Sequence, residues 1–279
     1  MLAMMTSLCL FACGKQEEAA PPIELEAGVS QIEITHHERT VDGSAYIPDR
    51  ARFPIVILSH GYGGSKEDFR KEAQLLMENG IGAITITFCG SGSKDPSGFG
   101  TTNMTLFTEK EDLLATVDYA KRVKGYNGSL FLFGGSQGGM VTAMAAEDCA
   151  DDIKAMILLY AGFSIPDDWN TRNFPVSEYP TPESIPETIP WWGVTLGRNF
   201  VVTLRGLDVY QKMPDFKKPV LLMHGTADDL VPIACSERAA ALYPNAELVK
   251  YPGAVHGFTP TQIPDAQSKM LDFIKDNYR

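Results

Sequence analysis

Three side chains of this sequence are of the types that together cleave acyl bonds: Ser136, Asp228 and His256. An imidazole can accept the proton of a serine hydroxyl, and a carboxylate can hold the imidazole in the orientation that this transfer needs. The serine lies in GGSQG at residues 134–138, which fits the G-x-S-x-G pattern of a nucleophile elbow. Glycines are required beside such a serine because side chains there would collide with the strand and the helix. We therefore expect a catalytic triad of nucleophile, base and orienting acid.

The elements that could bring these residues together are short apolar strands directly before each of them. Such runs stand at residues 129–133, 219–223 and 247–251. Sites of open α/β sheets lie at the carboxyl ends of the strands, so the three side chains are expected at one rim of a sheet. Asp229 is the rival acid, but a shift of one residue turns its side chain away, which favours Asp228.

Strand-length apolar runs alternate with helical patterns over most of the chain. This alternation predicts an α/β fold with a mostly parallel central sheet and helices on both faces. A hairpin is predicted at the sheet edge, with His36 and His37 facing solvent at its end. The predicted strands are 31–36, 41–48, 53–59, 81–88 and 155–160, and the predicted helices are 65–79 with Ser65 as N-cap, 108–124, 141–150 and 264–278.

The loop HGYGG at residues 60–64 follows a predicted buried strand. Its glycines allow the backbone to approach a substrate carbonyl, so we expect the Tyr62 amide to form an oxyanion hole together with the Gln137 amide. His60 is interpreted as a structural residue that braces the loop by hydrogen bonds.

Residues 163–218 interrupt the alternation and are rich in proline. A loop of this length in a compact domain is usually functional, and we predict a small inserted cap at about 163–217. Trp191 and Trp192 within it could bind a flat apolar substrate or pack the cap onto the body; both readings stay open.

The chain has 279 residues and a net charge of −11, which favours one large domain and argues against a nucleic-acid partner. Cys89, Cys149 and Cys235 cannot all pair and match no zinc spacing, so we expect partly buried thiols; one disulfide stays open. No metal or organic cofactor is implied, and the sequence predicts no oligomeric state.

The first residues are typical of a targeting segment. Residues 1–12 are apolar and uncharged, too short to span a bilayer, and LFACG at 10–14 resembles a bacterial lipoprotein cleavage box. We expect a signal peptide at 1–12, lipidation of Cys13, a tether at 13–28 and the folded domain at 29–279. An exported cell-envelope protein, held at the membrane only by a lipid, is the resulting prediction.

From about residue 31 to its end the chain resembles α/β-hydrolases of the bacterial cinnamoyl/feruloyl esterase group. The resemblance rests on HGYGG at 60–64, GGSQGG at 134–139, HGTAD at 224–228 and HGF at 256–258, and on the cap segments LGRNF at 196–200 and LDVY at 207–210. It implies an α/β-hydrolase fold, a serine esterase that forms an acyl-enzyme on a small ester, and a cap that shapes an aromatic acyl pocket. Two positions depart from that pattern: Gly135, where many relatives have histidine, and Tyr62, where relatives often have phenylalanine.

Three other functions are compatible with these motifs. A serine exopeptidase would share the core, but the sequence offers no evident acidic pair for a peptide amine. An acyl-glycerol lipase or thioesterase would prefer long aliphatic acyl chains. A non-catalytic surface binding protein on the same scaffold would have no need of an intact triad.

Overall fold

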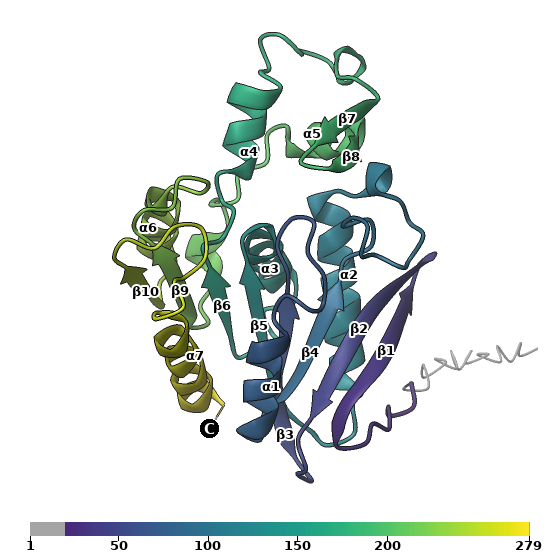
Figure 1. The fold of residues 1–279 in the computed structure, drawn as a ribbon, viewed down its shortest axis with the longest axis vertical. Coiled ribbons are helices and arrows are strands. Elements are labelled where there is room, and N and C mark those ends of the chain that lie inside the picture. The colour runs from purple at the N-terminus through teal and green to yellow at the C-terminus, as the bar shows by residue number, and fades with distance from the viewer. Residues whose placement is uncertain (1–19, 279) are drawn as a thin grey trace, which may run out of the picture.

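The structure, a computed structural model, describes residues 20–278. Its centre is an eight-stranded sheet in the order β1-β2-β4-β3-β5-β6-β9-β10 (Figure 1). The pairs β1–β2 and β2–β4 are antiparallel and all other pairs are parallel. The strands are β1 Gly28–His36, β2 Arg39–Ile47, β3 Phe53–Ser59, β4 Gly82–Thr87, β5 Tyr126–Gly135, β6 Ala155–Leu159, β9 Val220–Gly225 and β10 Ala246–Tyr251. The predicted α/β architecture with an edge hairpin is confirmed.

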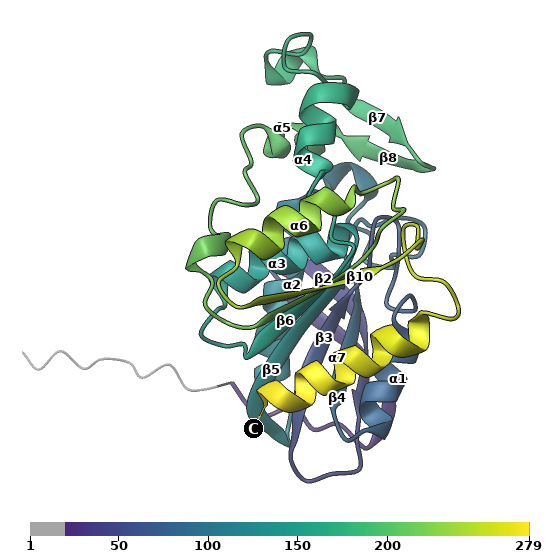
Figure 2. The same cartoon turned by 90° about the vertical axis from the view of Figure 1, so that its left-hand side faces the viewer.

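Helices cover both faces of this sheet, and each face has its own apolar core (Figure 2). Helices α1 and α7 pack on one face, while α2, α3 and α6 pack on the other. Strands β3 and β6 are buried throughout, as expected of strands covered on both sides. The helices are α1 Arg70–Glu78, α2 Leu106–Lys121, α3 Gln137–Asp148, α6 Ile233–Leu242 and α7 Ile263–Asn277. Helix α6 is an element that the sequence analysis missed.

Three predicted helix starts were wrong. Helix α3 begins at Gln137, directly after the nucleophile, and not at residue 141. Helix α1 begins at Arg70 because residues after Ser65 form a turn, in which the Asp68 amide donates to the Ser65 carbonyl at 3.0 Å. Helix α2 begins before residue 108 because Thr105 and Thr108 form a reciprocal capping box at its N-terminus.

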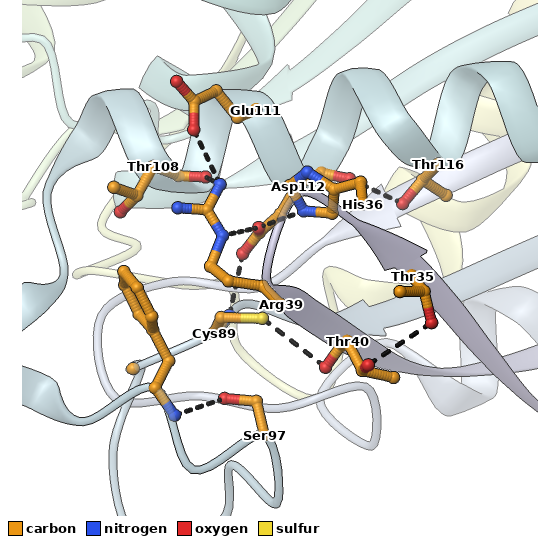
Figure 3. A network of polar contacts seen from close by, with 12 residues as sticks. Thr35, His36, Arg39, Thr40, Cys89, Ser97, Thr108, Glu111, Asp112 and Thr116 are labelled. Atoms are coloured by element: carbon orange, nitrogen blue, oxygen red, sulfur yellow. Dashed lines mark hydrogen bonds and ion pairs between the residues drawn. The ribbon is translucent and has the colours of Figure 1, made fainter.

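The prediction that His36 faces solvent was also wrong. Its Nε2 lies 2.7 Å from Oδ1 of the buried Asp112 on α2, and its side chain is only 12% exposed (Figure 3). Arg39 contacts the same carboxylate and also Glu111, so the hairpin end is fastened to α2 by charged groups. Only His37, at the turn itself, is exposed.

The predicted insertion forms a separate layer above the carboxyl ends of the strands, between β6 and β9 (Figure 1). It contains α4 Ile165–Asp168, the antiparallel pair β7 Thr188–Trp191 and β8 Val194–Gly197, and α5 Arg198–Leu204. Single helical turns lie at Trp169–Asn173, Pro182–Ser184 and Met213–Asp215 in this region and at Thr101–Asn103 in the body. The cap rests on the last of these turns: the Thr101 hydroxyl donates to the Thr195 carbonyl at 2.5 Å, and a Cβ at Gly197 would overlap the Thr102 carbonyl oxygen.

The predicted signal peptide and the lipidation site Cys13 lie outside the described residues. Part of the predicted tether differs from a free linker, because Ile23 forms a parallel bridge with Val123 and its amide donates to the Arg122 carbonyl at 2.8 Å. Between residues 20 and 278 no helix is long and apolar enough to cross a bilayer.

Candidate active site

Ser136 lies at the sharp turn between β5 and α3, with φ 54° and ψ −126°. This left-handed backbone is costly for a residue with a side chain, and four backbone hydrogen bonds hold it. The Ser136 amide donates to the Leu159 carbonyl at 2.9 Å, and the Ser136 carbonyl accepts from the amides of Gly139, Met140 and Gly162. The glycine requirement at the elbow is steric, as predicted: a Cβ at Gly138 would overlap the carbonyl oxygens of β3 and of the loop that follows it.

The structure brings the three predicted triad side chains into one hydrogen-bonded line. His256 Nε2 lies 2.9 Å from Ser136 Oγ, and His256 Nδ1 lies 2.8 Å from Asp228 Oδ2. Since Nδ1 faces a carboxylate it donates, which leaves Nε2 to accept the serine proton. The Tyr160 ring packs edge-on against the imidazole, with centroids 4.8 Å apart, and so restricts its rotation.

The side chain of Asp228 is fully buried and is surrounded by donors. One oxygen accepts from the amides of Leu230 and Val231 at 3.0 and 2.9 Å. The other faces both His256 and His224, whose Nε2 lies 3.1 Å away. These contacts fix the position of the carboxylate, which can orient His256 and stabilise an imidazolium.

His224 was not predicted to be a functional residue. Its Nε2–H is shared between Asp228 and the Val231 carbonyl, and its Nδ1 accepts from the Ser236 hydroxyl at 2.7 Å. Burial lowers the pKa of His224, so it serves as a neutral donor. The signal available in the sequence was its spacing: His224 ends the strand four residues before the acid.

Tyr62 and Gln137 line the same cavity as Ser136. Within the described part of the chain, neither backbone amide donates a hydrogen bond, so both are free to bind a substrate oxygen. His60 braces this loop as predicted: the Phe88 amide donates to its Nε2 at 3.0 Å, and its Nδ1–H donates to the Gly61 carbonyl at 2.6 Å. Burial lowers the pKa of His60, which keeps the ring neutral.

A cavity of about 280 Å³ opens between the elbow and the cap. Its cap side is largely aromatic, with Trp169, Trp191, Trp192 and Phe200, and its polar groups include Asp229. Trp191 stacks on Trp192 with centroids 5.6 Å apart, and its carbonyl accepts from the Tyr62 hydroxyl at 2.9 Å. Trp192 is 62% exposed. Trp191 thus both lines the cavity and joins the cap to the body, whereas Trp192 stands at the mouth.

No group of three or more metal-ligating side chains occurs among residues 20–278. The three cysteines of that range are free thiols, and burial raises the pKa of Cys89 and Cys149 to about 12. They take no part in the arrangement around Ser136.

Comparison with sequence families gives a match over residues 51–200 to Hydrolase_4, described as serine aminopeptidase, S33. Among solved structures, Est1E from Butyrivibrio proteoclasticus with bound ferulic acid superposes with a TM-score of 0.79 and 27% identity. That match covers 88% of this chain and 98% of Est1E.

Curated sequences show shorter matches. The bifunctional esterase/perhydrolase DCH of Acinetobacter calcoaceticus is 29% identical over 99 residues, which are 33% of this chain and 36% of that protein. A non-heme haloperoxidase of Rhodococcus erythropolis is 38% identical over 78 residues, 28% of this chain and 25% of that protein. The chain therefore spans about a third or less of the lengths of these relatives.

Proposed function

Because the chain belongs to the Hydrolase_4 family and has the α/β-hydrolase fold, we propose that it is a serine carboxylic-ester hydrolase. The observation that supports this most directly is the hydrogen-bonded line from Ser136 through His256 to Asp228, with Ser136 lining an open cavity. A Ser136 side chain buried away from the cavity, or a His256 ring pointing away from Ser136, would have excluded nucleophilic catalysis by this serine.

The proposed reaction runs through an acyl-enzyme. Ser136 Oγ attacks the ester carbonyl while His256 takes its proton and passes it to the leaving alcohol. Asp228 orients His256 and stabilises the imidazolium. The amides of Tyr62 and Gln137 hold the oxyanion, each donor contributing about 3 kcal/mol by analogy with measured cases. A water molecule, activated by His256, then releases the acid.

For the substrate we propose esters of feruloyl or cinnamoyl type. The aromatic lining of the cavity suits a flat aromatic acyl group, and Est1E, similar over nearly its whole length, has been solved with ferulic acid. The volume of about 280 Å³ lies near the lower end of small-molecule sites, which favours one ring over a long aliphatic chain.

The test compares turnover of methyl ferulate with that of methyl butyrate by the wild-type chain, Ser136→Ala and a control, Ser268→Ala, at an exposed position on α7. Ser136→Ala should lose at least about 10³-fold in kcat, and the control should behave as wild type. Ester hydrolysis that persists in a clean Ser136→Ala preparation would refute the nucleophile. Equal turnover of butyrate esters would refute the aromatic preference and favour a lipase or thioesterase.

A serine exopeptidase is the second candidate, favoured by the description of the family model. The cavity contains two carboxylates, Asp168 and Asp229, which could receive a peptide amine. However, Asp168 already lies 3.1 Å from Arg172. Cleavage of aminoacyl nitroanilides at rates above those of the esters would favour this alternative. Absence of fluorophosphonate labelling at Ser136 would instead favour a non-catalytic binding protein.

We further propose that the chain is exported and anchored through Cys13. The bridge between Ile23 and Val123 lies at the amino ends of the strands, opposite the cavity. An anchor there would hold the cavity away from the lipid surface. Cys13→Ser should move the protein from the membrane fraction to the soluble fraction of cells; an unchanged distribution would refute the anchor.

A further inference from the structure

A buried carboxyl group lies directly behind the elbow, and the proposed reaction does not use it. Glu109, in the first turn of α2, is 1% exposed. Both of its oxygens lie 2.9 Å from Nε2 of Gln137, the residue that follows the nucleophile. Among residues 20–278 it forms no ion pair with a lysine, arginine or histidine. The only hydrogen-bond partner of its carboxyl group in that range is a neutral amide.

The neighbouring carboxyl on the same helix has the opposite environment. Asp112, one turn further along α2, lies 2.7 Å from His36 Nε2 and 3.2 Å from Arg39 Nε, and it accepts from the Cys89 amide at 2.8 Å (Figure 3). Of two carboxyl groups about one helical turn apart, Asp112 therefore has a cationic partner and Glu109 has none in the described part of the chain. Such pairs commonly divide into one ionised and one neutral member.

Glu109 contacts the side chain of Gln137, whose backbone amide is one proposed oxyanion donor, and it interacts electrostatically with the hydroxyl of Tyr62, whose backbone amide is the other. Its partner Gln137 carries one of the two amides, and the charge of Glu109 is felt at Tyr62, whose pKa is raised to about 12 first by burial and then by Glu109. We propose that Glu109 is a positioning residue, a neutral carboxylic acid that fixes the Gln137 turn, and that its ionisation weakens transition-state stabilisation at Ser136.

Burial without a neighbouring cation among the described residues determines the protonation state of Glu109, against the effect of its hydrogen bond. Burial raises the pKa of Glu109 to about 8, the hydrogen bond from Gln137 opposes that rise, and the Asp112 carboxylate adds to it. The titratable groups facing Glu109 are therefore Asp112 and Tyr62, and beyond Asp112 stand His36 and Arg39. At neutral pH the acid is mostly protonated.

The consequence for catalysis has a definite sign. Above pH 8 a negative charge would stand behind amides that must bind a developing oxyanion. Two like charges about 12 Å apart at an effective dielectric constant near 20 would disfavour the transition state about tenfold. We therefore expect kcat/KM to fall to a lower plateau through the pKa of Glu109. KM should change little because the ground-state ester carries no such charge.

The experiment measures kcat and KM from pH 6 to pH 10 in wild type, Glu109→Gln, Glu109→Leu and the control Asp118→Asn, an exposed carboxylate on the same helix. Wild type and the control should share the alkaline fall of about tenfold, estimated as above. Glu109→Gln, which mimics the neutral acid, should lack it. Glu109→Leu should lose about tenfold in kcat at pH 7 because Gln137 loses its partner, a loss that Glu109→Gln rescues.

This inference rests on the proposed esterase function, so a second measurement stands apart from turnover. In the infrared difference spectrum of wild type minus Glu109→Gln, the band of a protonated carboxyl should be present and should titrate near pH 8. The subtraction removes the contribution of Glu147, whose pKa burial raises to about 7. If that band is present but esters are not cleaved, the esterase function fails and the neutral Glu109 stands. A band that is missing at pH 6, or an alkaline fall that persists in Glu109→Gln, would overturn the inference.

Discussion

Replacing Glu109 with glutamine should make the protein increasingly more stable than wild type as pH rises from 5 to 7. The pKa of this carboxyl is raised from its ordinary 4.5 to about 8 because it is buried without a cation. Unfolding exposes the group, so the unfolded chain releases its proton at lower pH than the native chain does. The stability contribution is fully present below pH 4.5 and is lost as pH rises toward 8.

The size of the effect follows from proton linkage. Between pH 5 and pH 7 the native state binds about one proton more at this group than the unfolded state does. The free energy of unfolding therefore falls by about 1.4 kcal/mol for each pH unit. The wild-type free energy of unfolding should therefore fall by about 3 kcal/mol over that range relative to Glu109→Gln. For a chain of this length the gap in Tm should widen by about 6–12 °C.

The assay is urea unfolding and thermal unfolding of both variants at pH 5, 6 and 7. Subtracting the variants removes the contributions of all other titrating groups, and Asp118→Asn, exposed on the same helix, serves as the control for loss of a carboxylate. A difference between wild type and Glu109→Gln that stays constant from pH 5 to pH 7 would show that the buried acid titrates normally, and the reasoning from burial would be refuted.

Four further outcomes follow from the site. Asp228→Asn should lower kcat about 10⁴-fold by analogy with other triads, whereas Asp229→Asn should change it less than tenfold; the reverse ranking in steady-state kinetics would exchange the two acids. His224→Phe should lower kcat about tenfold with KM nearly unchanged, because Asp228 loses a hydrogen-bond donor; a wild-type kcat would show that His224 does not position Asp228. Gly138→Ala should destabilise the fold by about 3 kcal/mol or more in urea unfolding, because its Cβ would overlap backbone carbonyls; an unchanged midpoint would contradict the steric account. Trp192→Ala should raise KM for methyl ferulate about threefold to tenfold, with little change for methyl acetate; equal effects on both esters would exclude ring contact.

The parts of the site that the sequence predicted are those that depend on strand ends. The serine, the acid and the histidine each follow an apolar strand, and parallel strands place their carboxyl ends at one rim. Their meeting was therefore inferable without knowing how any helix packs. The glycines of the elbow could also be predicted from the sequence, because local backbone geometry leaves no room for a side chain there.

Two of the missed features depend on contacts between elements that lie apart in the sequence. Glu109 looks like an ordinary solvated residue in the first turn of a helix, and only the packing of α2 against α3 buries it beside Gln137. His36 likewise reads as a turn residue until Asp112 is brought to it from α2. The start of α1 was missed because a serine can cap a turn as readily as a helix.

The cap contacts the body at the turn Thr101–Asn103, through Thr195 and Gly197. This contact fixes one side of the cap, and the other side lies away from the body. Strand β8 cannot move away from the body without breaking the close contact between Gly197 and the Thr102 carbonyl. Residues 175–184, in contrast, are mostly exposed. The length and composition of residues 175–184 can therefore change while the floor of the cavity stays the same. None of residues 175–184 lines the cavity, so a library of variants confined to them should leave the turnover of small esters unchanged.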